Sequence, residues 1–205
     1  MQEPVVYVVD DDAAVRDALA TLIRSIGLAV RVFDHPQTFL AEYQEEEIGC
    51  ILLDVRMPMV SGMAVYEHLK ANGSRMPVIM ITGHGDVSLC RTAFKSGVTD
   101  FLTKPIDDQV LTESLQRAIC ASIAAHQKAE SKANIRARFG RLTEREQEVC
   151  NLIVDGLPNK AIAGRLNLAL RTVENHRAAI FQKMEVESLA QLVRFSVALT
   201  GPALE

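Results

Sequence analysis

The segment VVYVVDDD, residues 5–12, is a run of apolar residues that ends in three carboxylates. The same ending recurs further along the chain, where other short β-rich runs stop at polar residues. Asp54 follows ILL, Thr82 follows VIMI, and Thr103 and Lys104 follow FL. Runs of this kind, separated by helical patterns, predict a parallel sheet with crossover helices.

This alternation covers residues 1–120 and predicts an α/β, flavodoxin-like unit, a five-stranded parallel sheet with strand order 2-1-3-4-5. The expected strands cover residues 5–9, 28–33, 50–54, 78–81 and 100–102, and the expected helices cover residues 15–26, 38–47, 63–71, 87–96 and 107–138. In such sheets the functional crevice lies outside the carboxyl ends of the strands. We therefore expect the polar residues at the strand ends to meet at one edge.

The rest of the chain is expected to be helical. Residues 121–139 contain no proline or glycine and are rich in Ala, Lys, Arg, Gln and Glu, which favours a helical linker. Residues 140–205 then form a small all-α domain of four short helices, which begins with a capping box from Thr143 to Glu146. A short helix at 159–166 followed by a longer one at 170–184 is a helix-turn-helix pattern.

Charge is distributed unevenly over these parts. Residues 1–120 hold 10 Lys and Arg against 17 Asp and Glu, residues 121–138 hold 4 against 1, and residues 139–205 hold 8 against 8. The chain is thus no generally basic nucleic-acid binder, and any DNA contact must depend on the local placement of charge.

The apolar stretches are too short to span a membrane and no signal region is present, so we expect a cytoplasmic protein. The four scattered cysteines predict neither a metal site nor a disulfide.

The carboxylates of the first part indicate metal and phosphoryl chemistry. Asp10, Asp11 and Asp54 cannot crowd together unneutralised, because like charges raise one another's pKa, and Mg²⁺ resolves this. A carboxylate can also act as a nucleophile and form an aspartyl phosphate, with Lys104 and Thr82 binding the phosphoryl oxygens. Capping of the first helix is the favoured role for Asp12, but capping explains neither Asp54 nor Lys104.

Four ordered segments resemble the receiver domain of two-component response regulators: VVDDD at 8–12, DVRMP at 54–58, ITGHG at 81–85 and TKP at 103–105. The resemblance implies that Asp54 accepts phosphate from a histidine kinase. It implies a Mg²⁺ site formed by Asp10, Asp11, Asp54 and the backbone carbonyl of Arg56. It further implies a switch pair, Thr82 and Phe101, a catalytic Lys104 and a cis peptide at Lys104-Pro105. Met59 departs from the glycine that relatives often carry there, which suggests a stiffened or blocked loop beside Asp54.

The helix from residue 170 is predicted to bury Val173, Ile180, Phe181 and Met184 and to expose residues suited to a major groove. Residue types alone leave DNA binding and a solvated helix in a protein-binding bundle about equal. The segments LTEREQEV at 142–149, GLPNKAIA at 156–163 and RTVENHR at 171–177 resemble the LuxR-type DNA-binding domain. The DNA-contacting residues are then expected to be Asn159, Lys160, Arg171, Thr172, Glu174, Asn175, Arg177 and Ala178. Pro158 and Ala169 replace serines that usually cap two of these helices.

Taken whole, the chain resembles the FixJ/NarL branch of response regulators, and the FixJ type most. The implied function is a transcription factor that is phosphorylated by a sensor histidine kinase, forms a homodimer through the receiver and binds double-stranded promoter DNA, with RNA polymerase as an expected partner. One alternative keeps the folds but binds DNA without phosphorylation, Asp54 being vestigial. Another is a Mg²⁺-dependent phosphatase, which is disfavoured because Arg56 stands where its general acid would be required.

Overall fold

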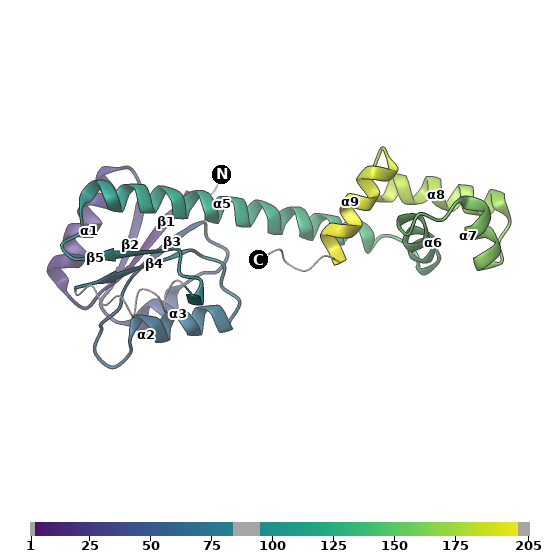
Figure 1. Ribbon diagram of the computed structural model, residues 1–205. Coiled ribbons are helices and arrows are strands. Elements are labelled where there is room, and N and C mark those ends of the chain that lie inside the picture. The colour runs from purple at the N-terminus through teal and green to yellow at the C-terminus, as the bar shows by residue number, and fades with distance from the viewer. Residues whose placement is uncertain (1–2, 84–94, 201–205) are drawn as a thin grey trace. The chain divides into compact units, whose positions relative to one another are not determined.

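The computed structural model describes residues 3–83 and 95–200, which belong to two compact units, Met1–His126 and Gln127–Glu205 (Figure 1). The helix expected at 87–96 lies outside the described residues except at its last two positions. The long helix α5 (Asp108–Phe139) contributes its first part to one unit and its last turns to the other. It is helical throughout residues 121–139, as the composition of that segment predicts.

The first unit is built on a parallel sheet whose strand order is β2-β1-β3-β4-β5, which confirms the predicted fold. The strands are β1 (Val5–Val9), β2 (Ala29–Phe33), β3 (Gly49–Asp54), β4 (Val78–Thr82) and β5 (Asp100–Thr103). The central strands β1, β3 and β4 are buried at every position, which accounts for their continuous apolar sequences.

Helices cover both faces of this sheet (Figure 1). On one face α1 (Ala13–Ser25) and the first part of α5 bury residues such as Ile23 and Leu115 against the sheet. On the other face α2 (Pro36–Glu42) and α3 (Gly62–Ala71) bury Phe39 and Leu69. Crossover helices on both faces place every strand's carboxyl end at the same edge.

The second helix is shorter than the expected 38–47, because α2 ends at Glu42. Tyr43 takes an extended backbone conformation there, and its ring packs against those of Tyr7 and Phe39, with centroids 5.8 and 5.5 Å away. Glu47 instead forms an ion pair with Arg31 at 2.8 Å. The contacts with Tyr7 on β1 and Arg31 on β2 accompany this early end of the helix.

The second unit consists of the last turns of α5 with α6 (Glu144–Val154), α7 (Asn159–Leu166), α8 (Leu170–Met184) and α9 (Leu189–Thr200). Its core buries Val149, Ile162, Val173 and Ile180. The predicted capping box is present at the start of α6. Helices α7 and α8 form the helix-turn-helix pair and have the predicted bounds.

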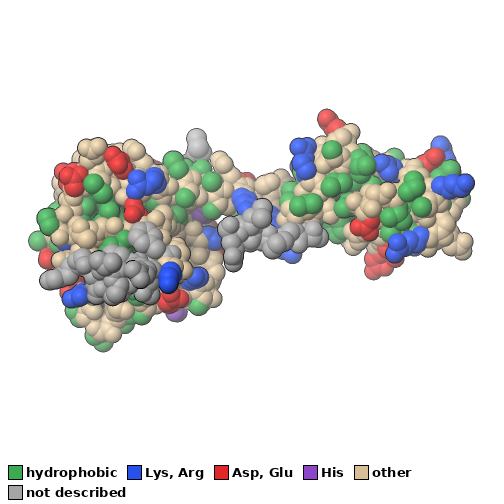
Figure 2. Space-filling model, viewed as in Figure 1, with side chains coloured by type: hydrophobic (Ala, Val, Ile, Leu, Met, Phe, Trp, Pro, Cys, Tyr) green, Lys and Arg blue, Asp and Glu red, His purple; other side chains and the backbone are tan. Residues whose placement is uncertain are grey.

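The surfaces of both units carry charged side chains of either sign (Figure 2). Within the described residues, no helix combines the length and the apolar character needed to cross a bilayer.

Candidate functional site

Four of the predicted site residues come together at the carboxyl edge of the sheet. The Lys104 ammonium lies 2.6 Å from Oδ2 of Asp10 and 2.8 Å from Oδ1 of Asp54, so it joins the ends of β1 and β3. The backbone N–H of Lys104 donates to the carbonyl oxygen of Thr82 at 2.7 Å, which holds the end of β5 against that of β4. The peptide Lys104-Pro105 is cis, as the resemblance implied.

Both carboxylates of this site are almost inaccessible to solvent. Asp10 is 1 % exposed and Asp54 is 4 % exposed. Burial raises the pKa of Asp54 above its ordinary value, while Lys104 and the backbone N–H of Arg56 act in the opposite direction. Burial alone would lower the pKa of Lys104, but its hydrogen bonds to Asp10 and Asp54 raise it overall. The edge therefore holds two buried carboxylates around one ammonium group.

Asp11 and Asp12 differ in their surroundings from Asp10. Asp12 caps α1, since its side chain accepts from the backbone N–H of Ala14 at 2.9 Å and of Val15 at 3.4 Å. Asp11 is exposed to solvent beside the buried pair. In the described ranges no three acidic, histidine or cysteine side chains are gathered closely enough to form a metal site by themselves. The donor types nevertheless fit Mg²⁺, which takes a few carboxylates and a carbonyl together with waters.

The loop that follows Asp54 is held close to the sheet. The N–H of Val55 donates to the carbonyl of Ile81 at 2.8 Å, and the N–H of Gly62 donates to the carbonyl of Val55 at 3.0 Å. Gly62 is packed so tightly that a Cβ built on it would lie 2.2 Å from the carbonyl oxygen of Asp54. Sequence patterns gave no indication of this contact, because it joins two backbone segments.

Met59 in this loop has a φ of 69°, the left-handed region in which glycine is preferred. This explains why a glycine suits the position. Its side chain is 95 % exposed, so it extends into solvent and does not fill the site beside Asp54.

The switch residues predicted from the resemblance lie on neighbouring strands. Thr82 is fully buried at the end of β4. Phe101 on β5 is half-buried and packs against the core on the α2 and α3 face of the sheet. The register pairs Thr82 with Thr103 and Met80 with Phe101.

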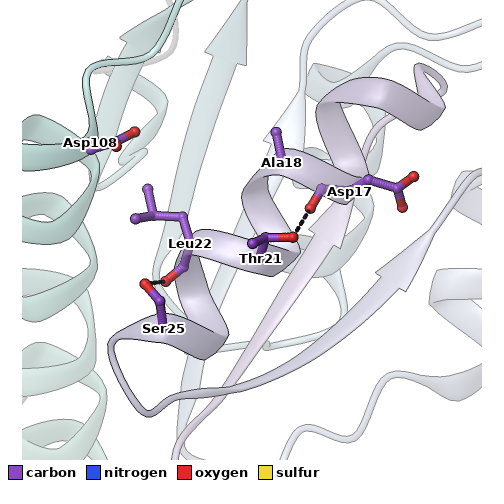
Figure 3. Close-up of a pocket in the computed structure, with 6 residues that line it drawn as sticks. All are labelled: Asp17, Ala18, Thr21, Leu22, Ser25 and Asp108. Carbon is purple, nitrogen blue, oxygen red and sulfur yellow. Dashed lines mark hydrogen bonds between the residues drawn. The ribbon is translucent and has the colours of Figure 1, made fainter.

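A hollow lies between α1 and the start of α5, with Asp17, Thr21 and Ser25 on one side and Asp108 on the other (Figure 3). The Thr21 hydroxyl donates to the carbonyl of Asp17 and the Ser25 hydroxyl to that of Leu22, so the helix itself satisfies both groups. An adjoining, mostly apolar groove of about 300 Å³ runs between the same helices and ends at Lys104 and Pro105.

In the second unit, α8 exposes several of the residues predicted to contact DNA. Arg171, Glu174, Asn175 and Ala178 are exposed and Thr172 is half-buried. The guanidinium of Arg171 lies 3.6 Å from the Glu174 carboxylate. Lys160 on α7 is also exposed.

Arg177 is more constrained than its neighbours. It donates to the side-chain oxygen of Asn159 at 3.3 Å, and its guanidinium lies 5.6 Å from the centre of the Phe181 ring. Phe181, which was predicted to belong to the buried stripe of this helix, packs against the core but is only half-buried, and its ring carries Arg177 on its surface. The hydrogen bond from Arg177 to Asn159 joins α8 to α7.

The two replaced capping residues leave their helices without side-chain caps. Pro158 precedes α7 and Ala169 precedes α8, and neither side chain accepts a hydrogen bond from the first turn. The backbone of Ala169, with φ −66° and ψ 145°, already has the extended conformation that capping residues adopt.

We therefore expect Ala169→Ser to stabilise the second unit. The new hydroxyl can accept from a first-turn N–H, which is worth ~1 kcal/mol in the free energy of unfolding. Urea denaturation of the full chain, followed by the unfolding of its helices, measures the change. Ala161→Ser inside α7 is the matched control and should lower stability slightly, because serine is a weaker helix former than alanine. Equal effects of the two changes would contradict a capping role for the new hydroxyl.

Two families match the sequence. Residues 6–116 match the response regulator receiver domain, and residues 141–196 match the luxR family of bacterial regulatory proteins. Among curated relatives, the chain is 40 % identical to the transcriptional regulatory protein FixJ of Bradyrhizobium diazoefficiens over 192 residues, 94 % of each chain. It is 39 % identical to the response regulator protein TmoT of Ectopseudomonas mendocina, over 94 % of this chain and 88 % of the relative.

Solved structures agree with this likeness. The response regulator StyR is 41 % identical, with a TM-score of 0.85 over 95 % of this chain and 98 % of StyR. Full-length FixJ from B. japonicum is 38 % identical, with a TM-score of 0.58 over 97 % of this chain and 98 % of FixJ.

Proposed function

Because the chain belongs to the two-component response regulators that join a receiver domain to a LuxR-type DNA-binding domain, we propose that phosphorylation of Asp54 controls its binding to promoter DNA. It is a FixJ-like transcriptional regulator. In this proposal residues 1–120 are the phosphoacceptor, residues 121–139 the linker and residues 140–205 the DNA-binding part. The receiver catalyses only its own phosphorylation and dephosphorylation, and the protein works in the cytoplasm.

The observation that supports this most strongly is the arrangement of Asp54, Asp10 and Lys104. An oxygen lone pair of the Asp54 carboxylate attacks the phosphorus of a phosphohistidine, and the bond from phosphorus to the imidazole nitrogen breaks. The nitrogen keeps that electron pair and takes up a proton from water. Lys104, which is 2.8 Å from Asp54, can follow the new acyl phosphate and neutralise one of its oxygens. The Thr82 hydroxyl is proposed to bind another.

Mg²⁺ is the cofactor that this chemistry requires. Asp10, Asp11, Asp54 and the carbonyl of Arg56 would hold it, and it would supply further charge neutralisation for the phosphoryl group. This assignment is supported by the balance of charge at the edge, because one ammonium, that of Lys104, is paired with two buried carboxylates.

The receiver family implies a histidine kinase partner. Asp54 ends β3 at the carboxyl edge of the sheet, so we propose that the phosphohistidine approaches from that edge. The apolar groove between α1 and α5 opens onto that edge at Lys104, so we propose that the kinase covers it.

Phosphorylation is proposed to draw Thr82 toward the phosphate and to change the packing of Phe101. The surface formed by β5 and its neighbouring helices then pairs with a second receiver. A homodimer brings two α8 helices to a two-fold-related promoter site, where RNA polymerase is the expected further partner.

Measuring DNA binding with and without acetyl phosphate and Mg²⁺ tests the proposal. Binding sites selected from random duplexes by the phosphorylated chain serve as probes. We expect phosphorylation to tighten binding and to double the mass of the protein in sedimentation. Equally tight binding in both states would favour the alternative regulator with a vestigial Asp54.

Asn175 of α8 is expected to contribute to base preference, whereas Lys160 of α7 is expected to contact DNA phosphates. Asn175→Ala should flatten the base preference, at a cost of ~1–3 kcal/mol for the base pair that it contacts. Lys160→Ala should weaken binding to all sequences about equally and lower the salt slope by about 1. Binding-site selection and salt titrations measure these effects. A motif that is unchanged by Asn175→Ala but altered by Lys160→Ala would reverse the assignment.

A further inference from the structure

The last turns of α5, which belong to the second unit, carry a row of three cations. Lys128, Lys132 and Arg136 are four residues apart and all exposed, so they follow one another along the helix surface. We call them the basic row; Figure 2 shows blue Lys and Arg side chains at the surface along this helix. Over residues 3–83 and 95–200, none of the three forms an ion pair or a side-chain hydrogen bond.

The helix that carries this row is anchored to the recognition helix. Ile135 is buried in the core of the second unit. Arg138 forms an ion pair with Glu185 at 2.9 Å and donates to the carbonyl of Met184 at 3.4 Å, both at the end of α8. Arg141 lies 3.4 Å from the same Glu185 carboxylate. These contacts fix the end of α5 to α8, and the same helix carries the basic row in the turns just before them.

The row begins on the side of α5 that packs against the bundle. Lys128 precedes Ile135 by seven residues and Phe139 by eleven, which puts it within about 20° of both around the helix axis. Lys132 is about 60° from Ile135. Since Ile135 and Phe139 contact the second unit's core, the first two ammonium groups extend on the bundle side of the helix, one to two turns before that contact.

The bundle itself has little positive charge to offer DNA. Residues 139–205 hold eight Lys and Arg against eight Asp and Glu. Of the cations on α8, Arg171 lies near Glu174 and Arg177 is bonded to Asn159. We propose that the basic row binds phosphates of the duplex that flank the segment contacted by α8. This inference rests on the DNA binding proposed above and extends its surface to the linker helix.

Two alternative roles suit the basic row less well. Cations near a helix C-terminus interact favourably with its dipole, but that effect is confined to the last turn. It accounts for Arg136 and not for Lys128 or Lys132. Pairing of this face with the same face of a second copy would bring like charges together, which is unfavourable. DNA phosphates are the complementary partner.

The test uses the full chain carrying Lys128→Gln, Lys132→Gln and Arg136→Gln, since glutamine keeps the helix propensity. The control carries Arg24→Gln, Lys70→Gln and Arg75→Gln, exposed cations of the first unit that lie outside β5, and has the same net charge. The probes are a 40-base-pair duplex selected by the unsubstituted chain and a scrambled duplex of equal length. Affinity is measured over a range of salt concentrations, and circular dichroism checks that both variants keep their helix content.

We expect the basic-row variant to lose about 10- to 100-fold in affinity for both duplexes and to lower the salt slope by about 2–3, against little change in the control. The selected motif should stay the same. A slope equal to that of the control would overturn the inference while leaving DNA binding intact. A change in dimer mass with unchanged affinity per dimer would assign the row to a second copy and also overturn it. If the unsubstituted chain selected no duplex from the random pool, the proposed function would be refuted together with this inference.

Discussion

Asp54→Asn should abolish phosphorylation of the chain by acetyl phosphate and Mg²⁺, whereas the unsubstituted protein should take up one phosphate. The amide has nearly the same shape as the carboxylate but no nucleophilic oxygen anion. The fold should persist, because Lys104 keeps its 2.6 Å ion pair with Asp10. Mass spectrometry of the intact protein measures the loss, and DNA binding should no longer respond to the phosphodonor.

Asp12→Asn is the matched control for this change. It replaces the same functional group at the same edge of the sheet, and asparagine caps a helix about as well as aspartate. Phosphate uptake by this variant should therefore remain close to normal. If Asp54→Asn still became phosphorylated, on Asp10 or Asp11 for example, the assignment of the phosphoacceptor would be wrong.

The fold of the first unit could be predicted from the sequence because its signals are local. The buried strands β1, β3 and β4 are apolar at almost every position, and their polar ends at Asp10, Asp54 and Thr82 mark one edge of a parallel sheet. Which of those side chains touch could not be predicted. The bridge that Lys104 makes between Asp10 and Asp54 depends on side-chain packing across 94 and 50 residues of chain.

Features made by contacts between distant segments were missed for the same reason. Helix α2 ends early where the Tyr43 ring packs on Tyr7, a contact that periodicity does not register. The resemblance predicted that Arg177 and Asn159 both contact DNA, but not that they hydrogen-bond to each other, because this contact depends on how α7 meets α8. The composition of residues 121–139 predicted a helix, but not that Ile135 would be buried in the core of the second unit.

Gly62→Ala should severely impair phosphorylation although Gly62 carries no chemical group. A Cβ at this position would lie 2.2 Å from the carbonyl oxygen of Asp54 and 3.1 Å from the Cα of Val55, so the backbone must move. Such overpacking typically costs ~1–3 kcal/mol in stability. A shift of about 1 Å at a reacting group can lower a rate 10²-fold, and we expect a decrease of this order in the initial rate of phosphate uptake.

Gly83→Ala provides the comparison, because it adds the same methyl group beside Thr82, where no atom of residues 3–83 or 95–200 lies within 4 Å of the new Cβ. This variant should keep its stability and most of its phosphorylation rate. The rates are measured with acetyl phosphate at a temperature well below the unfolding midpoint of each variant, so that a slow rate reflects a displaced Asp54 and not unfolded protein. Normal phosphorylation of a folded Gly62→Ala protein would mean that the loop can yield without moving the nucleophile. The close approach of Gly62 to the Asp54 carbonyl would then be a packing detail with no part in positioning the site.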